Sequence, residues 1–181
     1  MSQKTEPKKN VSAPQPASTG LQAVHARMRS FLQGECVLAD LYELSHEELY
    51  DIAAQGSRLY ESGQLDSARK VFEGLTALDP CDAHFHTGLG AIYQKQGDLE
   101  RACLEYDRAV VLNERDVAAS CNRAEVLLQQ GKLEAAAADL KCISELDPRG
   151  EHGHSLRARG IALALGAMAH QARAQPPQPA R

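Results

Sequence analysis

The sequence predicts an all-α protein in which three similar helix pairs stack into a short solenoid. The first observation is a step of 34 residues that relates many positions, among them three glycines (63, 97, 131), three alanines (68, 102, 136) and two sets of leucines (65, 99, 133 and 78, 112, 146). The second is a pair of Asp-Pro dipeptides, at 79–80 and 147–148. A period of 34 residues with small residues at fixed offsets is typical of tetratricopeptide (TPR) helix pairs. We therefore expect three TPR helix pairs that form a right-handed α-solenoid, with N-terminal helices and a C-terminal capping helix.

The repeated small residues have physical reasons. Gly56, Gly90 and Ala124 fall where the two helices of a pair are expected to cross closely, so a larger side chain would push the backbones apart. The glycines at 63, 97 and 131 follow the first helix of each pair, where a left-handed C-cap is needed. The prolines at 80 and 148 stop the second helix, because proline has no N–H and clashes with the preceding turn. One pair cannot bury its apolar face alone, so the pairs must stack.

Residues 1–44 come before the repeats. Residues 1–20 are mostly Lys, Ser, Thr, Pro, Gln and Ala, and we expect this tail to be disordered because it has too little apolar surface to fold. Residues 21–44 form a predicted N-terminal helical region. One apolar stripe, at steps of three and four, predicts a helix that ends near Gly34, and its members are Leu21, Val24, Met28 and Phe31. A second short helical segment is expected from Cys36 to Leu44.

Residues 45–150 hold the repeats, which we divide as 49–82, 83–116 and 117–150. Ser45 and Glu48 form a capping-box pattern, so the first repeat helix should begin near His46. The remaining helices are expected at about 65–78, 82–95, 98–112, 117–129 and 133–146.

We expect residues 151–172 to contain a capping helix that starts near His154 and covers the open end of the third repeat. Its expected packing residues are Leu156, Ile161, Leu163, Leu165 and Met168, whereas Arg157, Arg159 and Arg173 are expected to face water. Residues 173–181 are rich in proline and are expected to be a disordered tail.

Composition and charge exclude several classes of protein. No stretch approaches 18 uninterrupted apolar residues, so we expect no membrane insertion. The N-terminus has three lysines without an apolar run behind them, which argues against a secretory signal and for a cytoplasmic protein. The number of cysteines, five, is odd, and no two have CxxC spacing, which is what we expect of reduced thiols.

The net charge of −4 is distributed unevenly: residues 1–20 carry +2, residues 151–181 carry +3, and the residues between them carry −9. So acidic a solenoid is not expected to bind nucleic acid, and a neutral or basic peptide suits it better.

Nothing in the sequence argues for an enzyme, a cofactor or a metal. The GxSxG, HExxH, P-loop and EF-hand patterns do not occur. Gly88-Leu89-Gly90 lies inside a predicted helix, so it is not a dinucleotide fingerprint. His84 and His86 would point some 200° apart on a helix and cannot chelate one ion as neighbours. We expect the histidines to be solvated or to line the groove.

The concave groove is the predicted binding site, because the first helix of each pair lines the concave face in this architecture. Positions off the packing stripe of those helices are left to meet a ligand. They are Tyr50, Ala53, Ser57 and Tyr60 in the first repeat, His84, Thr87, Ala91 and Gln94 in the second, and Ala118, Cys121, Glu125 and Leu128 in the third. Such a mixture of small, polar and tyrosine side chains suits an extended peptide.

The second repeat carries a more specific resemblance. The run Leu78-Asp79-Pro80-Cys-Asp82-Ala-His-Phe85-His-Thr-Gly88-Leu89-Gly90-Ala91 is similar to the central segment of the class II chaperones of bacterial type III secretion, the SycD/LcrH type. The similarity continues through Gly97-Asp98, Tyr106, Ala109 and Arg123-Ala124-Glu125, and it covers about residues 21–170.

This resemblance implies a cytoplasmic bacterial chaperone that keeps hydrophobic, pore-forming translocator proteins soluble and export-competent, and so a role in virulence. It implies that an extended cargo segment contacts the groove residues named above, and that a homodimer forms through Leu21, Val24, Met28 and Phe31. Some members of the family also bind a transcriptional regulator. The alternative is a general TPR adaptor that is not tied to secretion. An adaptor for protein C-termini would need several basic groove residues, and the sequence places chiefly Lys95 there, with Arg123 as a further candidate.

Overall fold

The computed structural model describes residues 20–174, which divide into two compact units between Glu43 and Leu44. The two units are described separately. Residues 1–19 and 175–181 lie outside the described residues, and they include nearly all of both tails that the sequence predicts to be disordered.

The first unit holds two helices, α1 (Gly20–Leu32) and α2 (Leu38–Leu41). Helix α1 ends where the sequence predicts, with Gly34 in the left-handed region at φ +74°. Helix α2 is much shorter than the segment expected from 36 to 44. The Asp40 carboxylate accepts a hydrogen bond from the Val37 backbone N–H at 2.9 Å, and Glu43 turns the chain with φ +58°. An ion pair between Arg27 and Glu43 joins α1 to the end of this unit.

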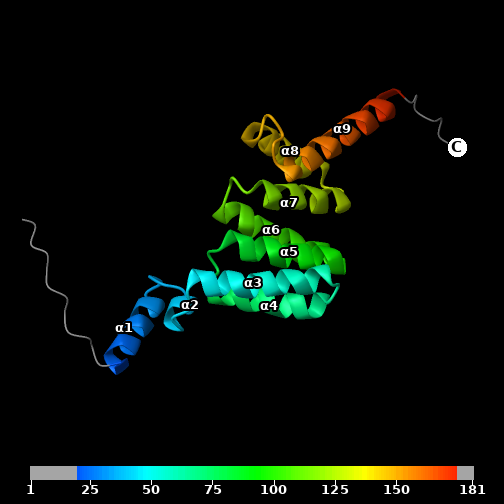
Figure 1. Cartoon of the computed structure of the whole chain (residues 1–181). Coiled ribbons are helices and arrows are strands. Elements are labelled where there is room, and N and C mark those ends of the chain that lie inside the picture. Colours follow the sequence, from blue (N-terminus) through cyan, green and yellow to red (C-terminus); the bar gives the residue numbers. More distant parts are fainter. Residues whose placement is uncertain (1–19, 175–181) are drawn as a thin grey trace, which may run out of the picture. The chain divides into compact units, whose positions relative to one another are not determined.

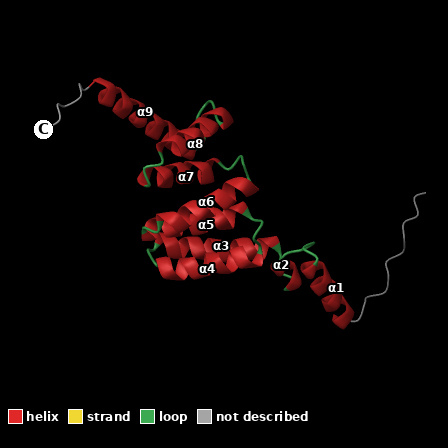
Figure 2. Cartoon of the chain, turned by 180° about the vertical axis from the view of Figure 1, so that it is seen from behind, coloured by secondary structure: helices red, strands yellow, loops and turns green. Residues whose placement is uncertain are grey.

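The second unit is a stack of helix pairs followed by one longer helix, and each helix of the pairs packs on the next in sequence (Figure 1 and, from behind, Figure 2). The described residues are helical or in turns and loops, as predicted for an all-α solenoid. The pairs are α3 (His46–Glu61) with α4 (Leu65–Leu78), α5 (Ala83–Gln96) with α6 (Leu99–Leu112), and α7 (Val117–Gln129) with α8 (Leu133–Leu146). The last helix is α9 (Gly153–Ala174).

The helix ends follow from local chemistry. Ser45 and Glu48 form the predicted capping box, in which the Ser45 Oγ accepts from the Glu48 N–H at 3.2 Å and the Glu48 carboxylate accepts from the Ser45 N–H at 2.8 Å. The first helix of each pair ends in a left-handed glycine with φ between +74° and +83°. The next residue donates its N–H back across the helix end, for example from Gln64 to the Leu59 carbonyl at 2.9 Å. This is the Schellman geometry that glycine makes possible.

The core depends on aromatic rings that pack against glycine backbone. Phe72 on α4 is 2% exposed, and its ring lies against Gly56 of α3 and Gly88 of α5. Tyr106 on α6 is fully buried, and its ring lies against Gly90 of α5. A Cβ atom built on Gly88 would stand 2.3 Å from the Phe72 ring, which is far inside contact distance. The glycines therefore allow the helices within a pair, and at Phe72 also the helices of adjacent pairs, to approach closely enough to enclose each ring.

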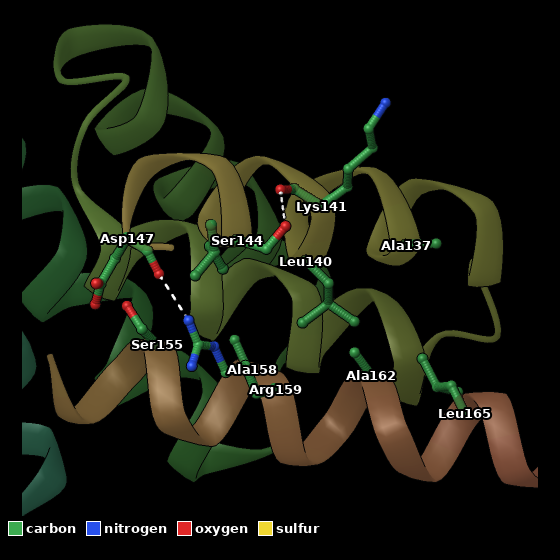
Figure 3. Close-up of a pocket in the computed structure, with 11 residues that line it drawn as sticks. Ala137, Leu140, Lys141, Ser144, Asp147, Ser155, Ala158, Arg159, Ala162 and Leu165 are labelled. Carbon is green, nitrogen blue, oxygen red and sulfur yellow. Dashed lines mark hydrogen bonds between the residues drawn. The ribbon is translucent and has the colours of Figure 1, made fainter. Parts of the chain in front are cut away.

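Helix α9 covers the third pair with small residues instead of the large ones expected. Ser155 and Ala158 are buried, and Ala158 joins a cluster with Cys121, Ala124, Leu140 and Ile143. In Figure 3, Ala158, Ala162 and Leu165 on α9 face α8 across a cavity of about 340 Å³. Ile161 and Leu165 pack partly against the cluster, but Leu156, Leu163 and Met168 are exposed, so the predicted stripe is wrong for these three.

The α8–α9 joint is held by one carboxylate and one guanidinium. The Asp147 carboxylate accepts from the backbone N–H groups of Gly150, Glu151 and His152 at 2.8, 3.1 and 3.0 Å. Arg159 donates to the backbone carbonyls of residues 147, 148 and 149 instead of facing water as predicted (Figure 3). The side chain of Arg173 lies outside the described residues. Together these bonds fix the direction in which α9 leaves the third pair.

Replacing Gly88 by Ala should destabilise the protein, because the new methyl group must displace the buried Phe72 ring. Overpacking of this kind costs about 1–3 kcal/mol. The matched control is Gly74→Ala on α4, where a Cβ would meet no atom within 4 Å. That change should stabilise the helix by about 0.5–1 kcal/mol. Urea unfolding of both variants measures the difference, and equal effects would show that the ring packing is not tight.

The stability of the α8–α9 joint should depend on pH through Asp147. Backbone hydrogen bonds, led by that from His152, hold the pKa of Asp147 well below its usual range. A depressed carboxyl pKa gives stability that is complete above the unfolded pKa, about 3.9, and is lost as pH falls toward the folded pKa. Asp147→Asn should therefore lower the urea midpoint at pH 7 and have less effect at pH 3. Asp79→Asn, at the equivalent place in the first repeat, removes one backbone bond instead of three and should cost less. An Asp147→Asn effect that does not change with pH would contradict this account.

Candidate functional site

The helices α3, α5 and α7, with the start of α9, surround a pocket of about 380 Å³. Four of the residues predicted for the groove line it: Tyr60, Ala91, Gln94 and Glu125. Five more complete the lining: Lys95, Tyr106, Asn122, His154 and Arg157. The structure thus brings together predicted groove residues from all three repeats.

The part of this pocket between the first and second repeats is built on two tyrosines, Tyr106, whose hydroxyl is hydrogen-bonded, and Tyr60, whose ring lies under a lysine. The Tyr106 hydroxyl donates to the Gln94 side-chain carbonyl at 2.9 Å, which fixes the amide and leaves its NH₂ directed away from the tyrosine. The Lys95 ammonium lies 4.4 Å from the centre of the Tyr60 ring, a cation–π arrangement. It also donates to the Tyr60 backbone carbonyl at 3.5 Å. Burial raises the pKa of Tyr106 above its usual range, so its hydroxyl stays protonated.

The part at the third repeat is closed by α9. Arg157 donates from Nε to the Glu125 carboxylate at 2.8 Å and from Nη2 to the Asn122 side chain. Burial, followed by the charge of Arg157, lowers the pKa of His154, so this imidazole is neutral at pH 7. The groove is therefore a polar chamber at this end, with a guanidinium supplied from outside the repeats.

Tyr50 and His84 lie together near the start of α3 and α5. Their rings stack at 5.5 Å between centroids, and Tyr50 also contacts the rings of His46 and Phe85. The Tyr50 hydroxyl donates to Asp82 at 3.0 Å. Burial, and then that hydrogen bond, raises the pKa of Tyr50 to about 12. This exposed aromatic cluster offers a flat apolar surface beside a carboxylate.

The other predicted groove residues are less available. The hydroxyls of Ser57 and Thr87 donate to carbonyls of their own helices at 3.0 and 2.9 Å, so they offer a ligand little beyond van der Waals contact. Ala118 and Leu128 are half-buried. Ala53 is 2% exposed and Cys121 is fully buried, so both lie beneath the surface in this structure. Burial also raises the pKa of the Cys121 thiol.

Comparison with known proteins agrees with this architecture. The family model described as tetratricopeptide repeat matches residues 53–114 and 92–148. The low calcium response locus protein H of Yersinia pestis is 33% identical over 132 residues, which cover 73% of this chain and 79% of that protein. Two structures of the type III secretion translocator chaperone SycD from Yersinia enterocolitica are each 30% identical, with a TM-score of 0.63 over 70% of this chain and 96% of SycD. The chain belongs to the SycD family of type III secretion chaperones.

Some of the related structures contain partners of those proteins. One SycD structure is an alternative dimer, and the other holds a peptide of the translocator YopD. PcrH in complex with the chaperone binding region of PopD is 29% identical to this chain, with a TM-score of 0.64 over 70% of this chain and 96% of PcrH.

Three polar residues of the pocket, Asn122, His154 and Arg157, lie outside the set of groove residues that the sequence predicts. Arg157 and His154 come from α9, which does not follow the 34-residue register, so no repeat argument could place them in the groove. Asn122 is adjacent in sequence to the predicted groove residue Cys121, and its polar side chain could have indicated a position in the groove. Arg123, the further basic candidate, lies elsewhere, because it forms ion pairs with Asp139 at 2.5 Å and Asp107 at 3.0 Å.

His86 is also not a groove residue. It is 4% exposed, and its Nδ1 lies 2.7 Å from Glu105 while its Nε2 lies 3.0 Å from the Pro80 carbonyl. Both partners are acceptors, so both bonds need a proton on each ring nitrogen. The hydrogen bond to Glu105 accordingly raises the pKa of His86. This histidine joins α5 to α6, and the expectation of a solvated or groove-lining side chain is wrong for it.

The predicted dimer residues of α1 that the structure describes are accessible. Val24 and Met28 are each 42% exposed and Phe31 is 36% exposed, and Leu32 beside them is 77% exposed. The side chain of Leu21 lies outside the described residues.

Between residues 20 and 174, no group of three or more His, Cys, Asp or Glu side chains is placed to hold a metal ion. Over the same residues, no helix has the length and apolar character that crossing a bilayer requires. All five cysteines are free thiols.

Proposed function

We propose that this chain is a cytoplasmic bacterial chaperone of a type III secretion system, which binds an extended segment of a hydrophobic translocator protein in its concave groove. The observation that carries the proposal is the pocket shared by α3, α5, α7 and α9, in a chain of the SycD family. The SycD structure with a YopD peptide supports the same mode of binding. Occupying the groove keeps the translocator soluble and competent for export.

A binding role suits the chemistry of the groove better than a catalytic one. Several of its polar groups are joined in pairs, as in Tyr106–Gln94 and Arg157–Glu125. The one thiol beneath it, Cys121, has a pKa raised by burial, whereas a nucleophilic cysteine needs a lowered pKa. Fixed donors and aromatic faces hold a peptide without reacting with it.

Among the groove residues that the sequence predicts, the two tyrosines are the expected anchors for cargo. Tyr60 presents a half-buried ring to the pocket, and Tyr50 presents an exposed ring beside His84. Aromatic side chains of this kind dominate the energetics of many interfaces. The buried Ala53 and Cys121 support the groove from below, so we propose cargo contact for the accessible members of the set.

We also propose a homodimer that buries the exposed apolar side chains of α1. A cluster of accessible Val, Met, Phe and Leu side chains on one short helix is costly to leave in water. The alternative dimer of SycD supports self-association in this family.

Co-expression tests the chaperone proposal. A hydrophobic translocator of the same secretion system should be recovered in the soluble fraction when the chain is present, and in the insoluble fraction when it is absent. Tyr60→Ala should weaken binding of the translocator about 5- to 30-fold, as expected for an anchor worth about 1–2 kcal/mol. Leu133→Ala, at an exposed apolar position on α8, is the matched control and should bind normally. A translocator that stays insoluble with the wild-type chain would contradict the proposal.

The dimer is tested by solution mass. Changing Val24 and Met28 together to Asp should convert the dimer to a monomer in multi-angle light scattering, because two carboxylates would have to be buried at the contact. Leu163→Asp, on the exposed side of α9, is the control and should leave the mass unchanged. A monomeric wild type, or loss of the dimer only in Leu163→Asp, would contradict the assignment to α1.

A further inference from the structure

The pocket lined by α3, α5, α7 and the start of α9 is positively charged within an acidic protein. Residues 21–150 have a net charge of −9. Among the residues that line this pocket, Lys95 and Arg157 are cationic and Glu125 is anionic, while His154 is neutral at pH 7 because its pKa is lowered. Asp116 and His152 also face His154. The lining therefore has a net charge of +1, opposite in sign to the body around it.

The donors in this pocket exceed its acceptors. Arg157 has five N–H groups, and within the described residues Glu125 and Asn122 accept two of them. The Lys95 ammonium has only a long bond of 3.5 Å to a carbonyl. Gln94 lines the same pocket, and its NH₂ is a further donor, because its carbonyl oxygen already accepts from Tyr106. The Glu125 carboxylate, by contrast, is covered by Arg157 and is a poor partner for an incoming cation.

From this arrangement we propose that the pocket binds the carboxylate of an aspartate or glutamate side chain in the translocator segment. Lys95 supplies the main charge, Arg157 and Gln94 supply hydrogen bonds, and the Tyr60 ring packs against the methylene groups of the ligand side chain. The proposal rests on the proposed function and adds a chemical specificity to it. Each translocator segment that this chain accepts then carries an acidic residue at the position that reaches this pocket.

The arrangement favours this occupant on two grounds. A basic side chain would face the positive charges of Lys95 and Arg157, and like charges repel. A purely apolar side chain would remove water from the free donors without replacing their hydrogen bonds, which costs free energy. An acidic side chain is the one class that satisfies both the charge and the donors.

Peptide arrays provide the test. Overlapping peptides of YopD and PopD, acetylated and amidated so that they carry no terminal charge, are bound to the full chain, and the tightest peptide is then substituted at each position. One Asp or Glu should be required, with its amide counterpart binding about 3- to 10-fold more weakly, as for a partly exposed charged hydrogen bond. Free C-terminal versions of the same peptides test a terminal carboxylate as the alternative source.

Three variants assign the effect to the pocket. In Lys95→Met the acidic peptide and its amide counterpart should bind about equally, so that the two changes are not additive. Glu125→Gln makes the pocket more positive and should strengthen the preference for the acidic peptide about 3-fold or more. Lys70→Met, at an exposed position of α4 outside the pocket, removes the same charge from the surface and should leave the preference unchanged. Circular dichroism of each variant confirms that it is folded.

The outcomes separate the two proposals. If none of the translocator peptides binds, the proposed function fails and this inference fails with it. If peptides bind but no acidic position is preferred, or if Lys70→Met reduces the preference as much as Lys95→Met, the inference alone is overturned. Binding that requires the free C-terminus also overturns it, and would favour a terminal carboxylate in the pocket.

Discussion

The contact on which the rest of this structure depends is that between an aromatic ring and a glycine of the neighbouring helix. Phe72 touches both Gly56 and Gly88, and so joins the first helix pair to the second. Tyr106 lies against Gly90 within the second pair, and its hydroxyl donates to the groove residue Gln94. The packing of the repeats and the position of a groove side chain are therefore set by the same residue. A shift of Tyr106 that loosened the core would also move the amide that faces a ligand.

Periodicity predicts those parts of the fold that repeat, because a residue that recurs at the 34-residue step has the same packing environment in each repeat. The helices at 65–78, 117–129 and 133–146 have the predicted bounds, and the glycines at 63, 97 and 131 adopt the predicted left-handed conformation. Helix α2 and the packing of α9 were predicted poorly, because each occurs once. In α9, the buried face is set by the small residues Ser155 and Ala158, and a stripe of large apolar residues was the wrong signal.

The groove was predictable to the extent that it uses repeat positions. Tyr60, Ala91, Gln94 and Glu125 share one pocket, although they come from three repeats. Ala53 and Cys121 lie at equivalent positions of the first and third repeats, but both are buried. A helix that packs against neighbouring helices exposes fewer positions than an isolated helix would. Arg157 could not be found from sequence. Its place depends on how the Asp147–Arg159 joint directs α9 over α7, which is a matter of tertiary geometry.

A chaperone of exported proteins must also release its cargo, and the character of this groove bears on that requirement. Its donors are half-exposed and partly satisfied by one another, so each contact with a cargo segment exchanges one set of hydrogen bonds for another and gains little free energy. Affinity then has to come from several positions along the groove, from the Tyr50–His84 surface to the Arg157 pocket. Contacts distributed in this way are lost one at a time when a segment is pulled from one end. In our proposal, the same weak polar contacts allow the chaperone to hold the translocator and to release it for export.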